Sequence, residues 1–117
     1  AWSQGLTEKA LEAFAKAAQT PFGQTQIWPE LNRGRIFHLS LQNYEAAIDA
    51  YEHALQIFEE NAPVGESSPG YIEILFRLGQ VYAATGDIEL AKLNYESIRD
   101  IDPNYEPALA ALERLSQ

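Results

Sequence analysis

The chain has 117 residues, of which 46% are apolar, and its formal net charge is −9. This length suits one compact domain with a buried core, and the apolar content argues against a disordered chain. The acidic balance disfavours nucleic acid and anionic membranes as partners, because both are bound through basic patches. Because cysteine is absent, disulfides and thiol chemistry are excluded. No apolar run approaches the roughly 18 residues that a membrane-inserted helix needs.

The first predicted helix covers residues 5–19. A small, an aromatic and a second small apolar residue fall on one face of it, at Ala10, Phe14 and Ala17. Gly5 precedes Ala10 by five residues and is expected to occupy a turn between two helices. Residues 1–24 are therefore interpreted as part of a repeat, and the chain as a fragment of a longer protein.

A second helix pair is predicted over residues 25–61. Its second helix, 43–58, repeats the same spacing with Ala47, Tyr51 and Ala54. Its first helix is expected at about 29–39, where Gly34 comes one residue too early to face Ala47. Two alternatives stay open: the connection between the helices is one residue longer, or Arg35 takes the position where the helices cross.

A loop is predicted at residues 62–71. The equivalent alanines of the second helices, Ala47 and Ala91, are 44 residues apart, which is longer than one regular repeat. The excess falls in the stretch ENAPVGESSPG. Within it, Ser68 before Pro69 indicates an N-cap followed by a first-turn proline, and hence the start of a helix.

The most regular stretch is the 34-residue segment 72–105. Its first half spaces apolar and small residues for one helix face, and its second half does so again after a turn: Leu75, Leu78, Gly79, Tyr82, Gly86, Asp87, Ala91, Tyr95, Ile98 and Pro103. Gly79 and Ala91 are expected to face each other, so that two antiparallel helices approach closely. Asp102 and Pro103 are expected to start the next helix.

This spacing resembles the tetratricopeptide repeat, W-x2-L-G-x2-Y followed by A-x3-F and P, with Leu75 replacing the tryptophan and Tyr95 the phenylalanine. The resemblance is strong over 72–105 and good in the second helices. It continues into a capping helix at 105–116, within the terminal segment 106–117, where Glu113 and Arg114 are expected to face water. It implies an all-α solenoid of antiparallel helix pairs, a right-handed superhelix of about six helices with the first one truncated.

The sequence shows no sign of catalytic, cofactor or metal chemistry. His38 and His53 lie on different predicted helices without a ligand set at metal spacing, and they are interpreted as groove or surface residues. No phosphate-binding, dinucleotide or hydrolase motif occurs. The chain is therefore not expected to be an enzyme or to hold a cofactor.

A protein partner is the function that the resemblance implies. Related arrays bind a peptide or helix along the concave wall made by the first helix of each pair, and here the acidic residues concentrate on the second helices. Motif register assigns nine residues to this wall: Asn32, Arg35, Ile36, Leu39, Glu73, Phe76, Arg77, Gln80 and Ala83. Two roles stay open for the basic residues: Arg35 and Arg77 pair with a partner carboxylate, or Arg33, Arg35 and Arg77 only offset the acidic surface and keep the chain soluble. Leu39 and Phe76 are expected to supply apolar contact.

Two other functions stay open. As alternatives to partner binding, the chain would be a self-association module, or a regulatory domain of a larger enzyme or assembly factor. No targeting segment is recognisable in the sequence, and a cytoplasmic location is expected.

Overall fold

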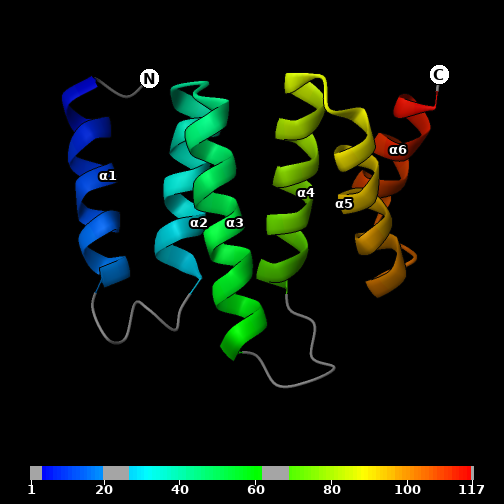
Figure 1. Cartoon of the computed structure of the whole chain (residues 1–117), viewed down its shortest axis with the longest axis horizontal. Coiled ribbons are helices and arrows are strands. Elements are labelled where there is room, and N and C mark those ends of the chain that lie inside the picture. The colour runs from blue at the N-terminus through cyan, green and yellow to red at the C-terminus, as the bar shows by residue number, and fades with distance from the viewer. Residues whose placement is uncertain (1–3, 20–26, 62–68, 117) are drawn as a thin grey trace. The chain divides into compact units, whose positions relative to one another are not determined.

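The computed structural model describes residues 4–19, 27–61 and 69–116, and every regular element in these ranges is a helix (Figure 1). The predicted all-α, helical repeat fold is confirmed. The chain divides into two compact units, residues 1–66 and 67–117, and each is described by itself below.

The first unit contains α1 (Gln4–Gln19), α2 (Trp28–Arg35), the short π-helix η2 (Ile36–Ser40) and α3 (Tyr44–Asn61). α2 packs against both α1 and α3. The core of this unit combines small and large side chains: Leu31, Ala47, Ala50, Tyr51, Ala54 and Ile57. Because small residues recur on one face of α3, α2 can approach it closely.

The turn predicted at Gly5 is wrong. α1 begins at Gln4, so Gly5 lies in its first turn instead of between two helices. The predicted helix at 5–19 is otherwise confirmed. Phe14 packs edge-on against Trp28 of α2, with ring centroids 6.1 Å apart.

Gly34 occupies the crossing of α2 and α3. A Cβ placed on it would collide with the ring of Tyr51, so any larger residue there would force that ring to shift. Between Gly34 and the N-cap residue Asn43 lie eight residues, whereas seven separate Gly79 from its counterpart Asp87. The additional residue is accommodated in η2, where the Leu41 N–H donates to the carbonyl of Ile36 five positions earlier. The longer connection is therefore correct, and Arg35 does not take the crossing position.

The end of η2 leads directly into the cap of α3. The side chain of Asn43 accepts a hydrogen bond from the Ala46 N–H at 3.2 Å, which satisfies one of the free N–H groups of the helix start. The preceding residue, Gln42, has a φ of 52°, in the left-handed region that favours glycine. In the second unit Gly86 takes the corresponding position before the cap residue Asp87, with a φ of 91°.

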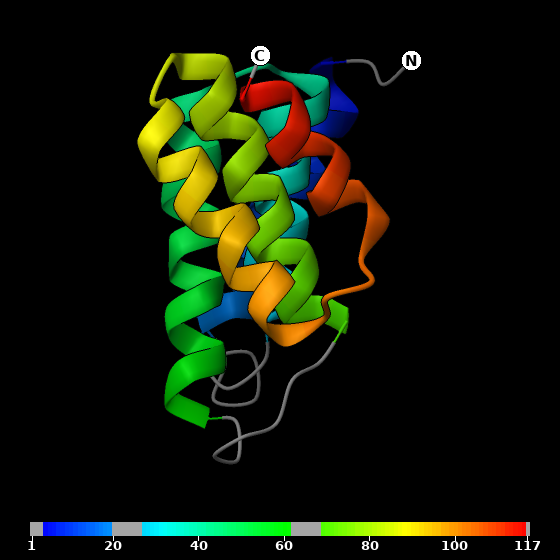
Figure 2. The ribbon, with the colours of Figure 1, turned by 90° about the vertical axis from the view of Figure 1, so that its right-hand side faces the viewer.

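The second unit contains α4 (Pro69–Thr85), α5 (Ile88–Ile101) and α6 (Glu106–Leu115). α5 packs against both α4 and α6 and runs back beside α4 after the turn at Gly86 (Figure 2). α4 starts at Pro69, as the Ser-Pro pair indicates, so the last three residues of the predicted 62–71 loop are helical; Ser68 itself lies outside the described residues. The core is formed by Ile74, Leu75, Leu78, Val81, Ala91, Tyr95, Ile98, Ala108 and Ala111.

Gly79 is buried at the crossing of α4 and α5, and the side chain nearest to it there is Tyr95. The three atoms closest to a Cβ at Gly79 all belong to the Tyr95 ring, the nearest being Cε1 at 2.5 Å. Ala91 is fully buried. It is therefore the Tyr95 ring that requires a glycine at position 79.

The start of α6 also differs from the prediction. Asp102 and Pro103 belong to the turn after α5, and the N-cap of α6 is Tyr105, which makes no side-chain capping bond. A proline in the first turn of α6, Pro107, fits the position that tolerates it. Glu113 and Arg114 are exposed, as expected for a helix with a solvent-facing side.

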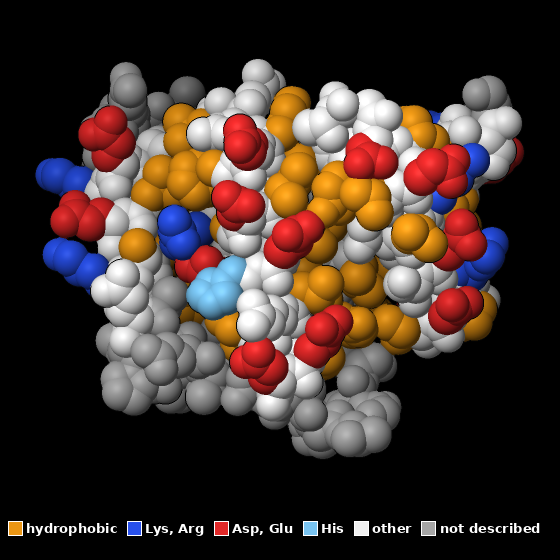
Figure 3. All heavy atoms as spheres, in the orientation of Figure 1, with side chains coloured by type: hydrophobic (Ala, Val, Ile, Leu, Met, Phe, Trp, Pro, Cys, Tyr) orange, Lys and Arg blue, Asp and Glu red, His pale blue; other side chains and the backbone are white. Residues whose placement is uncertain are grey.

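Acidic side chains are spread over α3 and, in the other unit, over α5 (Figure 3). These positions agree with the concentration of acidic residues expected on the second helices of the two complete pairs. α2 and η2 carry one acidic and two basic residues, while α3 carries five acidic residues and no Lys or Arg.

Candidate functional site

A cleft of about 470 Å³ opens in the second unit beside α4. Residues of α4 form one side of it, and the turn between α5 and α6 forms the other. Its lining consists of Ile72, Glu73, Phe76, Arg77, Asp102 and Tyr105. Three of the five wall residues expected on α4 therefore lie together in one cleft.

The α4 side of the cleft follows from helical spacing. Phe76 and Arg77 follow Glu73 by three and four positions, so both lie beside it on one face of the helix. All three are partly exposed. Of the other expected residues, Gln80 lies one turn further along and accepts a hydrogen bond from Arg77 Nη1 at 3.1 Å, while Ala83 does not line the cleft.

The opposite side of the cleft is set by a tight turn. Asp102 Oδ1 accepts a hydrogen bond from the Asn104 N–H at 3.1 Å, and the Asp102 carbonyl accepts one from the Tyr105 N–H at 3.1 Å. This turn brings the ring of Tyr105 edge-on to Phe76, with centroids 6.1 Å apart. Phe76 also contacts Tyr95, at 5.8 Å between centroids, which joins the cleft to the core.

The charges in the cleft are unequal. Arg77 Nε lies 3.6 Å from Glu73 Oε2, so these two charges largely offset each other. Within residues 69–116, Asp102 forms no ion pair, and it contributes the excess negative charge. Beneath the cleft, burial raises the pKa of the Tyr95 hydroxyl, an effect that the Arg114 cation partly opposes.

Sequence reasoning missed Asp102 and Tyr105 as cleft residues. Asp102 was expected to cap a helix, and Tyr105 was only the last residue of the repeat. The available signal was the turn chemistry of Asp-Pro-Asn, which reverses the chain after α5. Only the packed structure shows that this reversal carries Tyr105 back to α4.

The remaining expected wall residues lie in the first unit. Arg35 Nη1 donates a hydrogen bond to Asn32 Oδ1 at 2.8 Å, so both side chains are held along α2. Ile36 is half-buried, and Leu39 on η2 is 56% exposed. These four side chains offer a polar pair and an apolar group on the α2–η2 segment.

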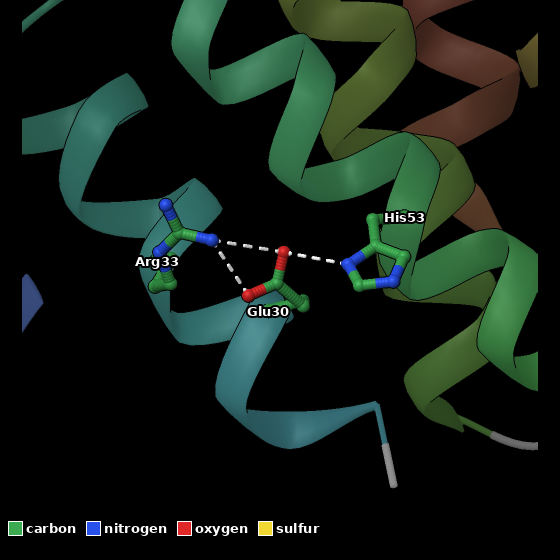
Figure 4. Close-up of polar contacts among 3 residues, drawn as sticks. All are labelled: Glu30, Arg33 and His53. Atoms are coloured by element: carbon green, nitrogen blue, oxygen red, sulfur yellow. Dashed lines mark hydrogen bonds and ion pairs between the residues drawn. The ribbon is translucent and has the colours of Figure 1, made fainter. Parts of the chain in front are cut away.

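A second polar cluster in the first unit joins α2 to α3 (Figure 4). Glu30 is buried, at 3% exposure, and its carboxylate accepts two hydrogen bonds from Arg33 Nη1 at 2.7 and 3.0 Å. His53 Nδ1 of α3 lies 2.9 Å from Glu30 Oε2. The sequence offered Glu30 only as one charge among many, because the burial of a carboxylate is not visible in a helix pattern.

This cluster is best described as a structural clamp. A buried carboxylate needs a paired charge and hydrogen-bond donors, and Arg33 and His53 supply them. Arg33 additionally lies over the ring of Phe37, 5.8 Å from its centroid. In the part of the chain that the structure describes, no group of three or more potential ligands could hold a metal ion.

No helix among the described residues is long and apolar enough to cross a membrane. The sequence matches none of the curated proteins compared with it. A family model, however, matches residues 25–104, which include both complete helix pairs, and it describes the tetratricopeptide repeat. Repeats of this family generally mediate protein–protein interactions and are typically non-catalytic scaffolds. By this match and by its paired helices, the chain belongs to the tetratricopeptide repeat family.

Proposed function

We propose that the chain is a protein-interaction module that binds an extended segment or a helix of a partner on the first helices of its pairs. The observation that carries this proposal is the cleft beside α4, where Glu73, Phe76 and Arg77 meet Asp102 and Tyr105. These residues were expected at a binding wall from register alone, or come from the turn that faces it.

The cleft has the composition of an anchoring pocket. Phe76 and Tyr105 supply aromatic surface, and aromatic side chains contribute strongly to protein interfaces. Charged groups at its edge can fix the orientation of a partner chain. A cleft of about 470 Å³ is large enough for one side chain of a peptide and is too small for a folded domain.

The α2–η2 segment offers a second contact in the first unit. Leu39 presents an exposed apolar side chain, and Arg35 is held in place by Asn32. Ile36 lies between them along the chain. We propose that these residues form a partner contact of their own within the first unit, and that Gln80 and Ala83 extend the contact along α4 within the second unit.

A peptide selection tests this function. Random peptides displayed on phage are selected for binding to the whole 117-residue chain. The selected peptides are then titrated into the isotope-labelled protein, and the amide chemical shifts are followed by NMR. The expected result is a cluster of shifts at Phe76, Arg77 and Tyr105. Phe76→Ala should weaken binding at least about tenfold, in line with the loss of an interface anchor.

Leu93→Ala is the matched control, because Leu93 is 60% exposed on α5 and does not line the cleft. It should leave peptide affinity unchanged. Circular dichroism of both variants checks that the helices are intact. Shifts confined to the outer side of α5, or equal loss of affinity in both variants, would refute binding at the cleft. Light scattering over a range of concentrations identifies self-association as the alternative outcome.

A further inference from the structure

The charges of the α4 cleft discriminate between partner side chains. The cleft has three charged groups. Arg77 Nε lies 3.6 Å from Glu73 Oε2, so the charges of these two side chains offset each other. Asp102 accepts one hydrogen bond from the Asn104 N–H and has no cationic partner among residues 69–116. The cleft thus carries one carboxylate in excess.

The aromatic lining has the same preference. Phe76 and Tyr105 meet edge-on at 6.1 Å, and the faces of such rings attract cations. Ile72 adds apolar surface beside them. A long alkyl chain ending in a positive charge matches both features, since its stem can lie on apolar surface while its head reaches a carboxylate.

The charge of the whole unit acts in the same direction. Residues 69–117 contain eight acidic and four basic side chains, so the surroundings of the cleft are negative as well. A field of this sign speeds the approach of a basic segment and repels an acidic one. An apolar anchor would cover Asp102 without pairing it, which costs free energy.

We propose that the cleft binds a lysine or arginine side chain of the partner, with Asp102 as the pairing carboxylate and Phe76 and Tyr105 along the alkyl stem. This inference rests on the proposed function, because it names the chemistry of the peptide bound there. It replaces the partner carboxylate expected at Arg77 with a cation, since Glu73 already offsets Arg77.

The test uses the peptides selected on the whole chain. Lysine or arginine should recur at one position among them, and replacing that residue with norleucine, which keeps the alkyl chain and removes the charge, should weaken binding roughly five- to tenfold. Asp102→Asn should weaken the basic peptide to a similar extent and leave the norleucine peptide unaffected. Asn keeps the oxygen that accepts the Asn104 N–H, so the turn is retained.

Asp100→Asn is the matched control. Asp100 lies two residues before Asp102, is exposed and does not line the cleft, so the variant removes the same charge outside the site. It should change affinity less than twofold. If peptides shift Phe76 and Tyr105 but carry acidic or apolar anchors, or if Asp102→Asn leaves the basic peptide unchanged, the cation site is refuted while peptide binding stands. If no peptide shifts these residues, the proposed function and the cation site both fall.

Discussion

The ring of Tyr51 lies so close to the backbone of Gly34 that a Cβ on residue 34 would overlap its Cδ1 and Cε1 atoms. Tyr95 and Gly79 stand in the same relationship in the second unit. In each pair of helices an aromatic ring of the second helix fills the space that glycine leaves on the first. This arrangement sets the distance between the helices and keeps both rings out of water.

Gly34→Ala is expected to destabilise the chain by about 1–3 kcal/mol, because the added methyl overpacks a filled crossing. Helix propensity alone predicts the opposite sign, since alanine is favoured over glycine in a helix by up to about 1 kcal/mol. Urea denaturation measures the difference. A variant as stable as the parent chain would show that Tyr51 moves aside without cost.

Gly79→Leu is expected to lower the free energy of unfolding more than Gly34→Ala does. The Cβ of a residue at position 79 would lie 2.5 Å from Cε1 of Tyr95, and leucine adds further atoms beyond that Cβ. Combining it with Tyr95→Ala should recover part of the loss, and a double-mutant cycle isolates the coupling. Additive effects of the two changes would contradict direct contact as the cause.

Gln42→Gly is expected to stabilise the chain by up to about 1 kcal/mol. The φ of 52° strains an L-residue, and glycine relieves this strain although it adds entropy to the unfolded chain. Thermal denaturation should show a higher midpoint for this variant. Gln42→Ala keeps the strain and serves as the control; an equal gain from alanine would trace the effect to the glutamine side chain.

Tyr95 should make the stability of the chain fall at high pH. Its pKa is raised above 10.0 in the folded state, so the proton is retained by the folded chain after the unfolded chain has released it. This contribution is complete below pH 10 and is lost as the pH rises through the folded-state pKa. Tyr95→Phe should therefore show a smaller loss of unfolding free energy between about pH 9 and pH 11, roughly one pH unit on either side of the ordinary tyrosine pKa, as measured by urea denaturation at each pH.

Arg33→Met should destabilise the chain by about 1–3 kcal/mol, because it leaves the buried Glu30 carboxylate with His53 as its remaining partner in the clamp. His53→Ala should cost less than about 1 kcal/mol, since His53 is 52% exposed and its pair with Glu30 is screened by water. Denaturation of both variants at one pH decides the order. If His53→Ala lowered the free energy of unfolding more than Arg33→Met does, the contact of His53 with α2 would matter more than the Arg33–Glu30 ion pair.

The register of the first helices placed Glu73, Phe76 and Arg77 on one face, and the structure brings these three together in a cleft. Register could not add Asp102 and Tyr105. They reach the cleft because a turn folds the chain back after α5, and a helix pattern contains no information about where the residues after its end will lie. The buried clamp of Glu30 and His53 was hidden for the same reason, since its members are 23 positions apart on different helices.

The helical class, the helix pairs and the stop at Gly86 could be predicted from the sequence, because apolar periodicity and turn residues are local features of the chain. Only the packed structure shows which atoms meet across the helix pairs: the Tyr95 ring lies nearest to Gly79, and Gly34 lies at the other crossing, with the additional residue taken up by η2. The physical reason is that close packing depends on the shapes of both surfaces at once. A one-residue change in a connection can be absorbed locally, so only the packed helices reveal where it goes.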